Sequence, residues 1–367
     1  MMNMNFLYRS GLKLAYKLDN EWVYQLLRKV FSYRLLKLAI HLSRRCNYQC
    51  SYCYVHHGYS SQTPDLGYEE WVRLIKEAHA IGVQKVSILG GEPLCEPYLE
   101  LLLKIITDLG MKASIYTNGS LVDNAWLDRI VIYKPLLIFK YDSDDTTYFR
   151  HTGQERYRLK DIEDRMKLCV ERGLRVIAFT TLTRKNVDRV GSIIQRALDV
   201  GALPAFERYL PVADDAINKE LDISDEQYFR AAEEISQRFR QVFKEWVAAV
   251  RIAGRGCGCY SDIIAVTPNG KVLPCAYLPD EASVGDVRQD PLALIRSRML
   301  AKAYPGVQSD PQCKSCEHKH VCAGGCYTYS YLKKGTYDRH CTKMATIGFC
   351  AYLLADIYET ADALKLK

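Results

Sequence analysis

The sequence of 367 residues lacks the long apolar stretches that mark membrane spans and secretion signals. No run of 18 apolar residues occurs anywhere, which excludes a conventional membrane span. The start of the chain, MMNMNFLYRSGLKLAYKL, has no uninterrupted apolar core with a small-residue cleavage site, so we expect a cytoplasmic protein. Internal repeats and low-complexity linkers are also missing. The net charge of +7 is modest for this length and gives little reason to expect a nucleic-acid partner.

The first 45 residues are basic, with nine Lys or Arg against Asp19 and Glu21. Their segment NEWVYQLLRKVFSYRLLKLAIHL, residues 20–42, is typical of an amphipathic helix that runs into a strand. Such a helix either packs on the following domain with its basic face in water or binds a membrane surface.

From residue 36 the chain alternates between strand-like and helix-like patterns. Apolar strand patterns cover residues 35–43, 85–91, 112–119, 136–143, 175–183 and 204–211. Helical patterns cover residues 68–82, 97–110, 158–173 and 187–201, and several of them end in glycine. This alternation predicts an α/β fold of some six βα units, with parallel strands in an open sheet or a barrel.

The second part of the chain has a different character. A charged helix is expected over about residues 224–250, followed by a β-hairpin around Pro268, Asn269 and Gly270. A cysteine-rich stretch covers residues 310–341, and a final helical pattern covers residues 343–365.

Cysteine is the residue type in unusual supply, with 14 copies. Clustered thiols in a chain without a secretion signal indicate metal ligands rather than disulfides. Directly after the first expected strand, Cys46, Cys50 and Cys53 form a C-x3-C-x2-C motif. A closed zinc site needs four ligands, so three thiols leave one position open or filled by a substrate.

A second motif lies at the end of the next expected strand. GGEP, from Gly90 to Pro93, places two glycines and a carboxylate there. Glycine permits a close backbone approach, and a carboxylate accepts a hydrogen bond from an ammonium group. Together, the two motifs resemble the radical S-adenosylmethionine (SAM) superfamily over about residues 36–225.

The resemblance implies a partial (β/α)6 barrel whose three-cysteine loop binds a [4Fe–4S] cluster. The amino and carboxylate groups of SAM would bind the fourth iron and complete its coordination. An electron from the cluster would then cleave SAM to a 5′-deoxyadenosyl radical. The positions that match SAM contacts are Tyr52, Gly90, Gly91, Glu92, Thr117, Asn118, Ser143 and Arg150. In the KYDS segment, Lys140 and Ser143 depart from the serine and glycine that relatives often carry.

The later cysteines resemble the SPASM extension of radical SAM enzymes over about residues 257–341. The spacings agree: C-x2-C-x5-C-x3-C begins at Cys313, and Gly270-x4-Cys275 closes the hairpin. The resemblance implies two auxiliary [4Fe–4S] clusters, for a total of three clusters. The first would take Cys257, Cys259, Cys275 and Cys326, and the second Cys313, Cys316, Cys322 and Cys341.

Three cysteines remain. We expect Cys169 and Cys350 in the apolar core, and Cys95 follows GGEP closely enough to approach the SAM site.

The expected domains are an N-terminal helical segment, the barrel, a linking helix, the SPASM domain and a C-terminal helix, at residues 1–35, 36–225, 226–256, 257–345 and 346–367. The expected function is hydrogen abstraction from a peptide or protein side chain, or from a small natural-product or cofactor precursor. Reduced ferredoxin or flavodoxin is the expected electron donor. An aspartate follows the hairpin cysteine in sulfatase-maturing relatives, whereas Ala276 follows Cys275 here. That difference predicts a reaction other than sulfatase maturation.

Two rival interpretations remain open. The eight later cysteines are also enough for two zinc sites of four thiolates, in a module that binds nucleic acid or protein without catalysis. The second rival interpretation is a pure electron carrier. Such a protein would need neither the GGEP motif nor a cluster with an open iron site.

Overall fold

The computed structural model describes residues 36–60, 62–142, 159–242, 259–302 and 326–334. The expected segments 1–35 and 346–367 lie outside the described residues. The expected linking helix is described as far as residue 242, within α11 (Asp225–Val242).

Six parallel strands form the main sheet, and they coincide with the six strand patterns of the sequence. They are β1 (Lys37–His41), β2 (Lys85–Leu89), β3 (Lys112–Thr117), β4 (Leu136–Lys140), β5 (Val176–Leu182) and β6 (Leu203–Arg208). Nearly all their residues are buried, because helices cover one face of the sheet and a side-chain-lined interior fills the other.

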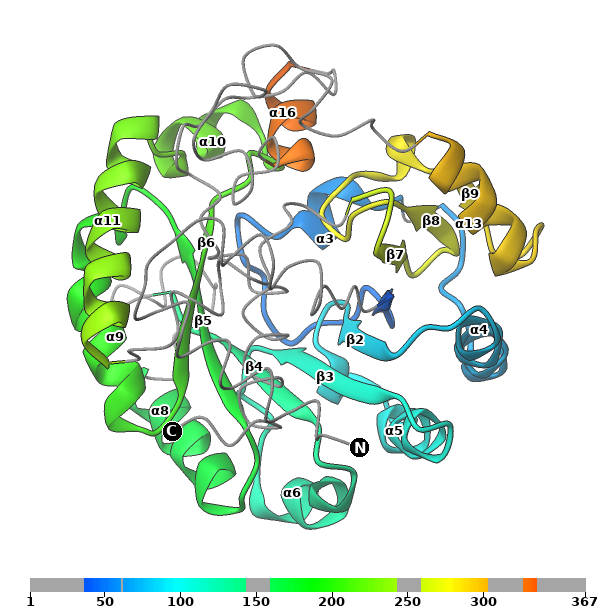
Figure 1. Ribbon diagram of the computed structural model, residues 1–367, viewed down its shortest axis with the longest axis horizontal. Coiled ribbons are helices and arrows are strands. Elements are labelled where there is room, and N and C mark those ends of the chain that lie inside the picture. Colours follow the sequence, from blue (N-terminus) through cyan, green and yellow to red (C-terminus); the bar gives the residue numbers. More distant parts are fainter. Residues whose placement is uncertain (1–35, 61, 143–158, 243–258, 303–325, 335–367) are drawn as a thin grey trace, which may run out of the picture.

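The helices lie along the outer face of the curved sheet (Figure 1). They are α4 (Tyr68–Ala80), α5 (Leu99–Asp108), α6 (Asn124–Ile130), α8 (Leu159–Glu171), α9 (Val190–Asp199) and α11. The sequence patterns identified all of these except α6. This short helix begins where the Asp123 carboxylate accepts a hydrogen bond from the Trp126 amide at 2.7 Å, a standard N-cap. The strand and helix order confirms the partial (β/α)6 barrel.

The predicted hairpin around Asn269 is present, and it joins the barrel sheet. Its strands are β7 (Ile263–Val266) and β8 (Lys271–Leu273), followed by the short β9 (Gly285–Asp286). β7 pairs in parallel with β1, from Lys37 opposite Ile263 to Ile40 opposite Val266. The described strands therefore form one sheet in the order β6-β5-β4-β3-β2-β1-β7-β8-β9, which continues across the domain boundary expected at residue 257.

Two helices of the C-terminal part are described, α13 (Leu292–Ala301) and α16 (Tyr327–Lys334). α13 packs beside α4, where the Leu292 amide donates to Glu77 at 2.9 Å. α16 lies near the end of β6, because the Arg208 guanidinium stacks on the Tyr329 ring at 4.3 Å. The C-terminal part thus contacts the barrel near its first strands and near its last strand, β6. Among the described residues, no helix is long and apolar enough to cross a membrane.

Candidate functional site

The three-cysteine loop is fixed to the end of β2 by main-chain contacts. The amide of Gly91 donates to the carbonyl of Ser43, and that of Glu92 to the carbonyl of Arg45, both at 2.8 Å. A Cβ on Gly91 would lie 2.0 Å from the Arg45 oxygen, and one on Gly90 would lie 2.9 Å from the Ser43 oxygen. The glycines of GGEP also line the cavity described below. The space that a side chain on either glycine would need is occupied by the main chain of the cysteine loop. Their absent side chains therefore allow the loop to approach the sheet.

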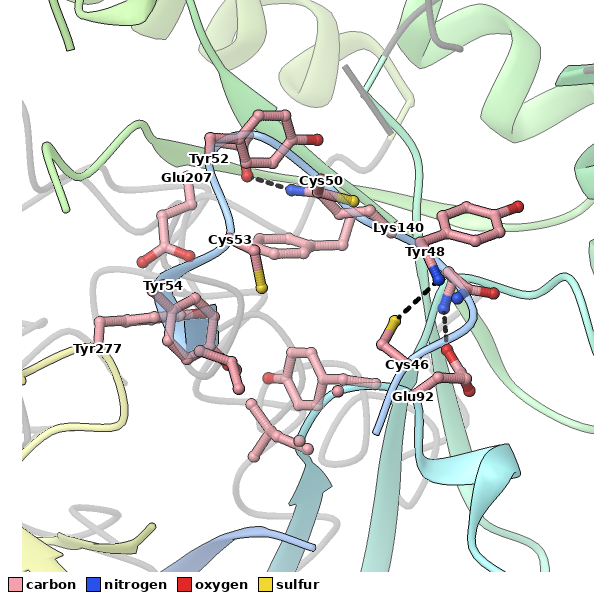
Figure 2. Close-up of a pocket in the computed structure, with 18 of the residues that line it drawn as sticks. Cys46, Tyr48, Cys50, Tyr52, Cys53, Tyr54, Glu92, Lys140, Glu207 and Tyr277 are labelled. Atoms are coloured by element: carbon pink, nitrogen blue, oxygen red, sulfur yellow. Dashed lines mark hydrogen bonds between the residues drawn. The ribbon is translucent and has the colours of Figure 1, made fainter. Parts of the chain in front are cut away.

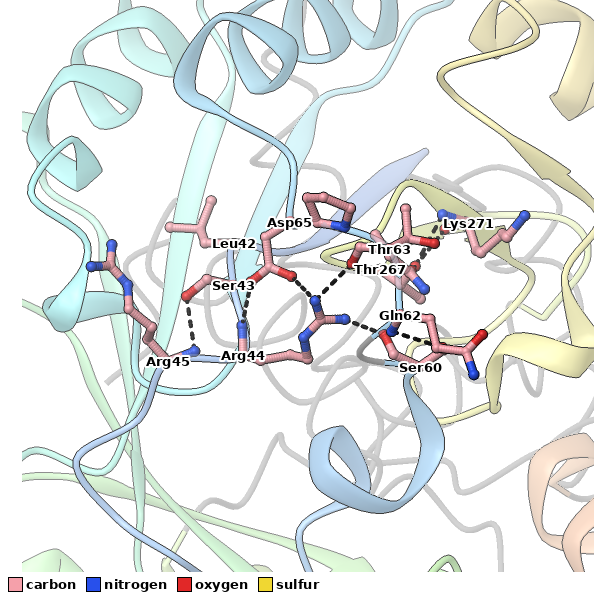
Figure 3. Close-up of polar contacts among 12 residues, drawn as sticks. Leu42, Ser43, Arg44, Arg45, Ser60, Gln62, Thr63, Asp65, Thr267 and Lys271 are labelled. Carbon is pink, nitrogen blue, oxygen red and sulfur yellow. Dashed lines mark hydrogen bonds and ion pairs between the residues drawn. The ribbon is translucent and has the colours of Figure 1, made fainter.

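Arg44 fastens the other side of the same loop (Figure 3). Its guanidinium pairs with Asp65 at 2.6 Å, donates to the Thr63 carbonyl at 2.9 Å and donates to the Ser60 carbonyl. These contacts connect the start of the cysteine loop to the segment that follows it. The cysteines are thereby held between two anchored ends.

The three thiols lie on the wall of one cavity, where Figure 2 shows the sulfurs of Cys46 and Cys53 turned toward a common space. Burial raises the pKa of Cys46 to about 12 and raises those of Cys50 and Cys53 as well. Such thiols ionise only when a cation compensates the charge, as a bound metal does. Among the described residues, no three His, Cys, Asp or Glu side chains converge on a point that would hold a single metal ion. Three thiol donors beside an open cavity do suit a cluster with three protein ligands and one open iron.

Glu92 is buried at the end of β2, with 1% of its surface exposed. Its carboxylate accepts hydrogen bonds from the Thr117 hydroxyl and the Asn118 amide, each at 2.7 Å, and from the Leu94 amide at 3.1 Å. Burial raises its pKa to about 7, and these three donors oppose the rise. The side chain is therefore rigidly positioned at the cavity wall.

The TNGS segment after β3 is linked to the cysteine loop by side-chain amides. The Asn118 amide nitrogen donates to the Asn47 oxygen at 2.9 Å, and the Asn47 nitrogen donates to the Ser120 hydroxyl at 2.7 Å. Asn47 directly follows the first cysteine. The structure thus brings together the three motifs that the sequence analysis associated with SAM.

Tyr52 in the cysteine loop and Lys140 at the end of β4 lie on the same wall. The Lys140 ammonium stands 5.2 Å from the centre of the Tyr52 ring and pairs with the Asp142 carboxylate at 3.0 Å. The Tyr52 hydroxyl donates to the same carboxylate. Lys140, which occupies the position of the family's serine, is therefore a cavity residue held by an ion pair rather than a solvated surface lysine.

The cavity opens at the carboxyl ends of the strands and measures about 1030 Å³, including its open mouth. Its wall is mainly aromatic and aliphatic, as expected of a site for an organic molecule. The aromatic residues of the wall are Tyr48, Tyr52, Tyr54, Tyr116, Phe179, Tyr209 and Tyr277.

The sequence analysis missed two charged residues of this cavity, Glu207 and Arg208 at the end of β6. Arg208 pairs with Asp225 at 2.6 Å, and Figure 2 shows Glu207 across the cavity from Glu92. A signal was available. In an otherwise apolar strand, two adjacent charged residues at the carboxyl end point to the site in a βα fold.

The remaining predicted site residues are described only in part. Cys259 and Cys275 are buried, and Cys326 precedes α16, with its sulfur accepting from the Tyr329 amide at 3.5 Å. Cys169 is buried in the core as predicted, and Cys95 is partly buried. The predicted site residues that lie outside the described residues are Ser143, Arg150, Cys257, Cys313, Cys316, Cys322 and Cys341.

Comparison with protein families places two matches on the chain. Residues 40–197 match the radical SAM superfamily, and residues 257–318 match SPASM, an iron–sulfur cluster-binding domain. Both domains imply iron–sulfur clusters, and the first implies SAM.

The curated proteins that are similar to most of the chain include the three that follow. The PqqA peptide cyclase of Granulibacter bethesdensis is 27% identical over 82% of this chain and 84% of its own length. The antilisterial bacteriocin subtilosin biosynthesis protein AlbA of Bacillus subtilis is 26% identical over 80% and 67%. The AdoMet-dependent heme synthase of Methanosarcina barkeri is 25% identical over 82% and 93%.

Solved structures share the fold. Streptococcus suis SuiB bound to its precursor peptide SuiA is 18% identical, covers 84% of this chain and 75% of its own, and has a TM-score of 0.64.

Proposed function

Because the chain belongs to the radical SAM superfamily and carries a SPASM iron–sulfur domain, we propose that this enzyme modifies a side chain of a peptide substrate by hydrogen abstraction. The proposal rests on one observation. Three thiols and one buried carboxylate line the same large cavity at the strand ends; they belong to Cys46, Cys50, Cys53 and Glu92. When bound, a reduced cluster and SAM together supply the radical that removes a hydrogen atom from the substrate.

The protein's own residues would supply position and a dry environment. Glu92, fixed by three donors, is placed to accept a hydrogen bond from the SAM ammonium group, and Thr117 and Asn118 hold it in place. The aromatic wall would keep water away from the reacting groups and so prevent side reactions with solvent. Lys140 and Tyr52 close the side of the cavity near β4 and β5.

The peptide substrate is supported by the relatives. Two of the three similar curated proteins are named for work on a peptide or a bacteriocin, and SuiB binds a precursor peptide. The auxiliary clusters would take the eight later cysteines in the two sets given above, which makes three clusters in all. Ferredoxin or flavodoxin would be the electron donor.

The test is anaerobic incubation of reduced, cluster-loaded protein with SAM and short peptides encoded beside its gene. We expect 5′-deoxyadenosine and a mass change in one peptide. A triple variant, Cys46→Ala with Cys50→Ala and Cys53→Ala, should lose both products and about four irons per chain, the content of one cubane. Cys169→Ala, at a buried cysteine outside the cavity wall, is the matched control and should keep them. If SAM were cleaved in the presence of a small-molecule substrate but with none of the peptides, the peptide assignment would be wrong.

A further inference from the structure

Lys140 places an ammonium group beside the cysteine loop. The serine that relatives often carry at this position would bring no charge. The Lys140 side chain is 24% exposed and lines the same cavity as the three thiols. Figure 2 shows it beside Cys50 and Tyr52. A positive charge therefore lies in the wall where the cluster would be held.

The ammonium group of Lys140 is fixed by four neighbours. It pairs with the Asp142 carboxylate at 3.0 Å and donates to the Thr181 hydroxyl at 2.5 Å. It also lies 5.2 Å from the centre of the Tyr52 ring and 5.3 Å from the centre of the Phe179 ring. A lysine side chain is flexible in itself, so these contacts decide where its charge lies.

The charge of Lys140 acts on two of the three thiols. Burial raises the pKa of Cys50 and of Cys53, and the Lys140 ammonium opposes both rises. At Cys50 the ammonium has a larger effect than the opposing effect of the Asp142 carboxylate. The ion pair is therefore oriented with its positive member toward the cysteine loop.

The net charge around an iron–sulfur cluster is one of the factors that set its reduction potential. A reduced cluster carries one more negative charge than an oxidised one, so a nearby cation favours reduction. Water screens this attraction only weakly where the charges are partly buried. The direction of the effect does not depend on the other charges of the cavity, because removal of the ammonium makes the site more negative in every case.

We propose that Lys140 raises the reduction potential of the SAM-binding cluster and so allows a weaker reductant to supply its electron. This inference rests on the proposed function, since it assumes that the cysteine loop holds a reducible cluster. One electron passes from an external donor, such as reduced ferredoxin or flavodoxin, to the cluster. Lys140 shifts the equilibrium of that transfer and is neither a ligand nor a source of electrons.

The test is a redox titration of the cluster-loaded protein without SAM, followed by electron paramagnetic resonance. The signal of interest is the one that the wild type gives and the triple alanine variant of the cysteine loop lacks. Lys140→Met keeps a long side chain and removes the charge. At a fixed potential it should lower the ratio of reduced to oxidised cluster about tenfold, a shift of about 59 mV for one electron. Lys140→Arg, which keeps the charge, should restore the wild-type ratio.

A second variant separates an electrostatic role from a structural one. Asp142→Asn keeps an acceptor oxygen and removes the negative member of the ion pair, so it should shift the midpoint upward. A merely loosened loop would shift the midpoint in the same direction in Asp142→Asn and Lys140→Met. Lys104→Met is the matched control, because this exposed lysine of α5 also pairs with a carboxylate, that of Asp108 at 2.6 Å. It should leave the midpoint unchanged.

The outcomes separate this inference from the proposed function. A midpoint that is not lowered in Lys140→Met, or shifts of the same direction in Lys140→Met and Asp142→Asn, overturn the role of Lys140 and leave the proposed function standing. If Lys140→Met fails to take up iron, Asp142→Asn decides, and a midpoint that does not rise overturns the role. If the wild type and the triple alanine variant give the same signals, the cysteine loop holds no cluster and both proposals fail.

Discussion

The phenol of Tyr59 donates a 2.6 Å hydrogen bond to the main-chain carbonyl of Ala276, which lies 217 positions further along the chain. The His41 Nε2 atom lies 3.2 Å from the same phenol oxygen, and both side chains are buried. One residue on, the Ser60 amide donates to Asp280 at 2.9 Å. The segment after the cysteine loop is therefore joined to the segment that carries Cys275.

Tyr59→Phe should destabilise the protein. The change leaves the Ala276 carbonyl and the His41 nitrogen without this partner in a buried place, which costs about 1–3 kcal/mol. Urea unfolding of the cluster-loaded protein measures it, with Tyr133→Phe at a half-exposed tyrosine as the control. An unchanged midpoint for Tyr59→Phe would show that the hydrogen bond contributes nothing to the junction.

His41 makes the stability of the protein sensitive to acid. Burial lowers its pKa from 6.5 to about 3, so between these values the unfolded chain binds a proton that the folded chain does not. Stability should therefore fall as the pH drops below 6.5, by roughly 1.4 kcal/mol for each pH unit from this group.

His41→Gln should flatten that dependence, because glutamine does not titrate. The measurement is the urea midpoint of the cluster-loaded protein at several pH values between 5 and 7. Equal slopes for the wild type and His41→Gln would refute the assignment.

Gly91→Ala should disable the proposed SAM site while the fold persists. The added Cβ would meet the Arg45 carbonyl carbon at 2.5 Å as well as its oxygen, and main chain cannot swing aside as a side chain does. The cysteine loop must shift, so we expect loss of about four irons and of SAM binding. Gly58→Ala is the matched control, since its Cβ would find an ordinary contact at 3.6 Å from Pro279. Wild-type iron content in Gly91→Ala would contradict this prediction.

The enzyme should not oxidise serine or cysteine to formylglycine. Such an oxidation removes a proton as well as electrons and needs a base within reach of the substrate. Ala276 offers no base at the position where sulfatase-maturing relatives carry an aspartate, and the nearest downstream carboxylate, Asp280, is bound by the Ser60 amide and, at 2.6 Å, by the Asn269 side chain. Incubation with a sulfatase-motif peptide tests this prediction, and formylglycine formed over several turnovers would disprove it.

The sequence predicted the six barrel strands and most of the helices that cover them because their patterns are local. Each strand of the barrel is a short apolar run, and most of the long helices follow a 3.6-residue period that ends near glycine. α6 was missed because seven residues carry too little periodicity, although the sequence from Asp123 to Trp126 contained its N-cap. The three motifs that the resemblance associates with SAM were predictable because each is a short contiguous segment at a strand end.

The relations between distant segments could not be predicted in the same way. Nothing near Ile263 indicates that its strand pairs with the one at Lys37, because a parallel pair carries no turn signal between its members. The hydrogen bond from the Tyr52 hydroxyl to the Asp142 carboxylate likewise depends on how the cysteine loop lies against the end of β4. Glu207 could have been predicted as a site residue from its place at the end of β6. Its position relative to Glu92 could not, because it depends on the order of the strands in the folded sheet.

The parallel pairing of β7 with β1 has a consequence for synthesis of the chain. β1 ends at residue 41 and β7 begins at residue 263, so about 220 residues must leave the ribosome before the two can meet. At 5–20 residues per second this takes roughly 10–45 s. Throughout that interval one side of β1 lacks its partner from β7, and an open strand edge is a template for pairing with other chains. Yield of this protein in a cell should therefore depend on translation rate and on chaperones that cover the nascent barrel.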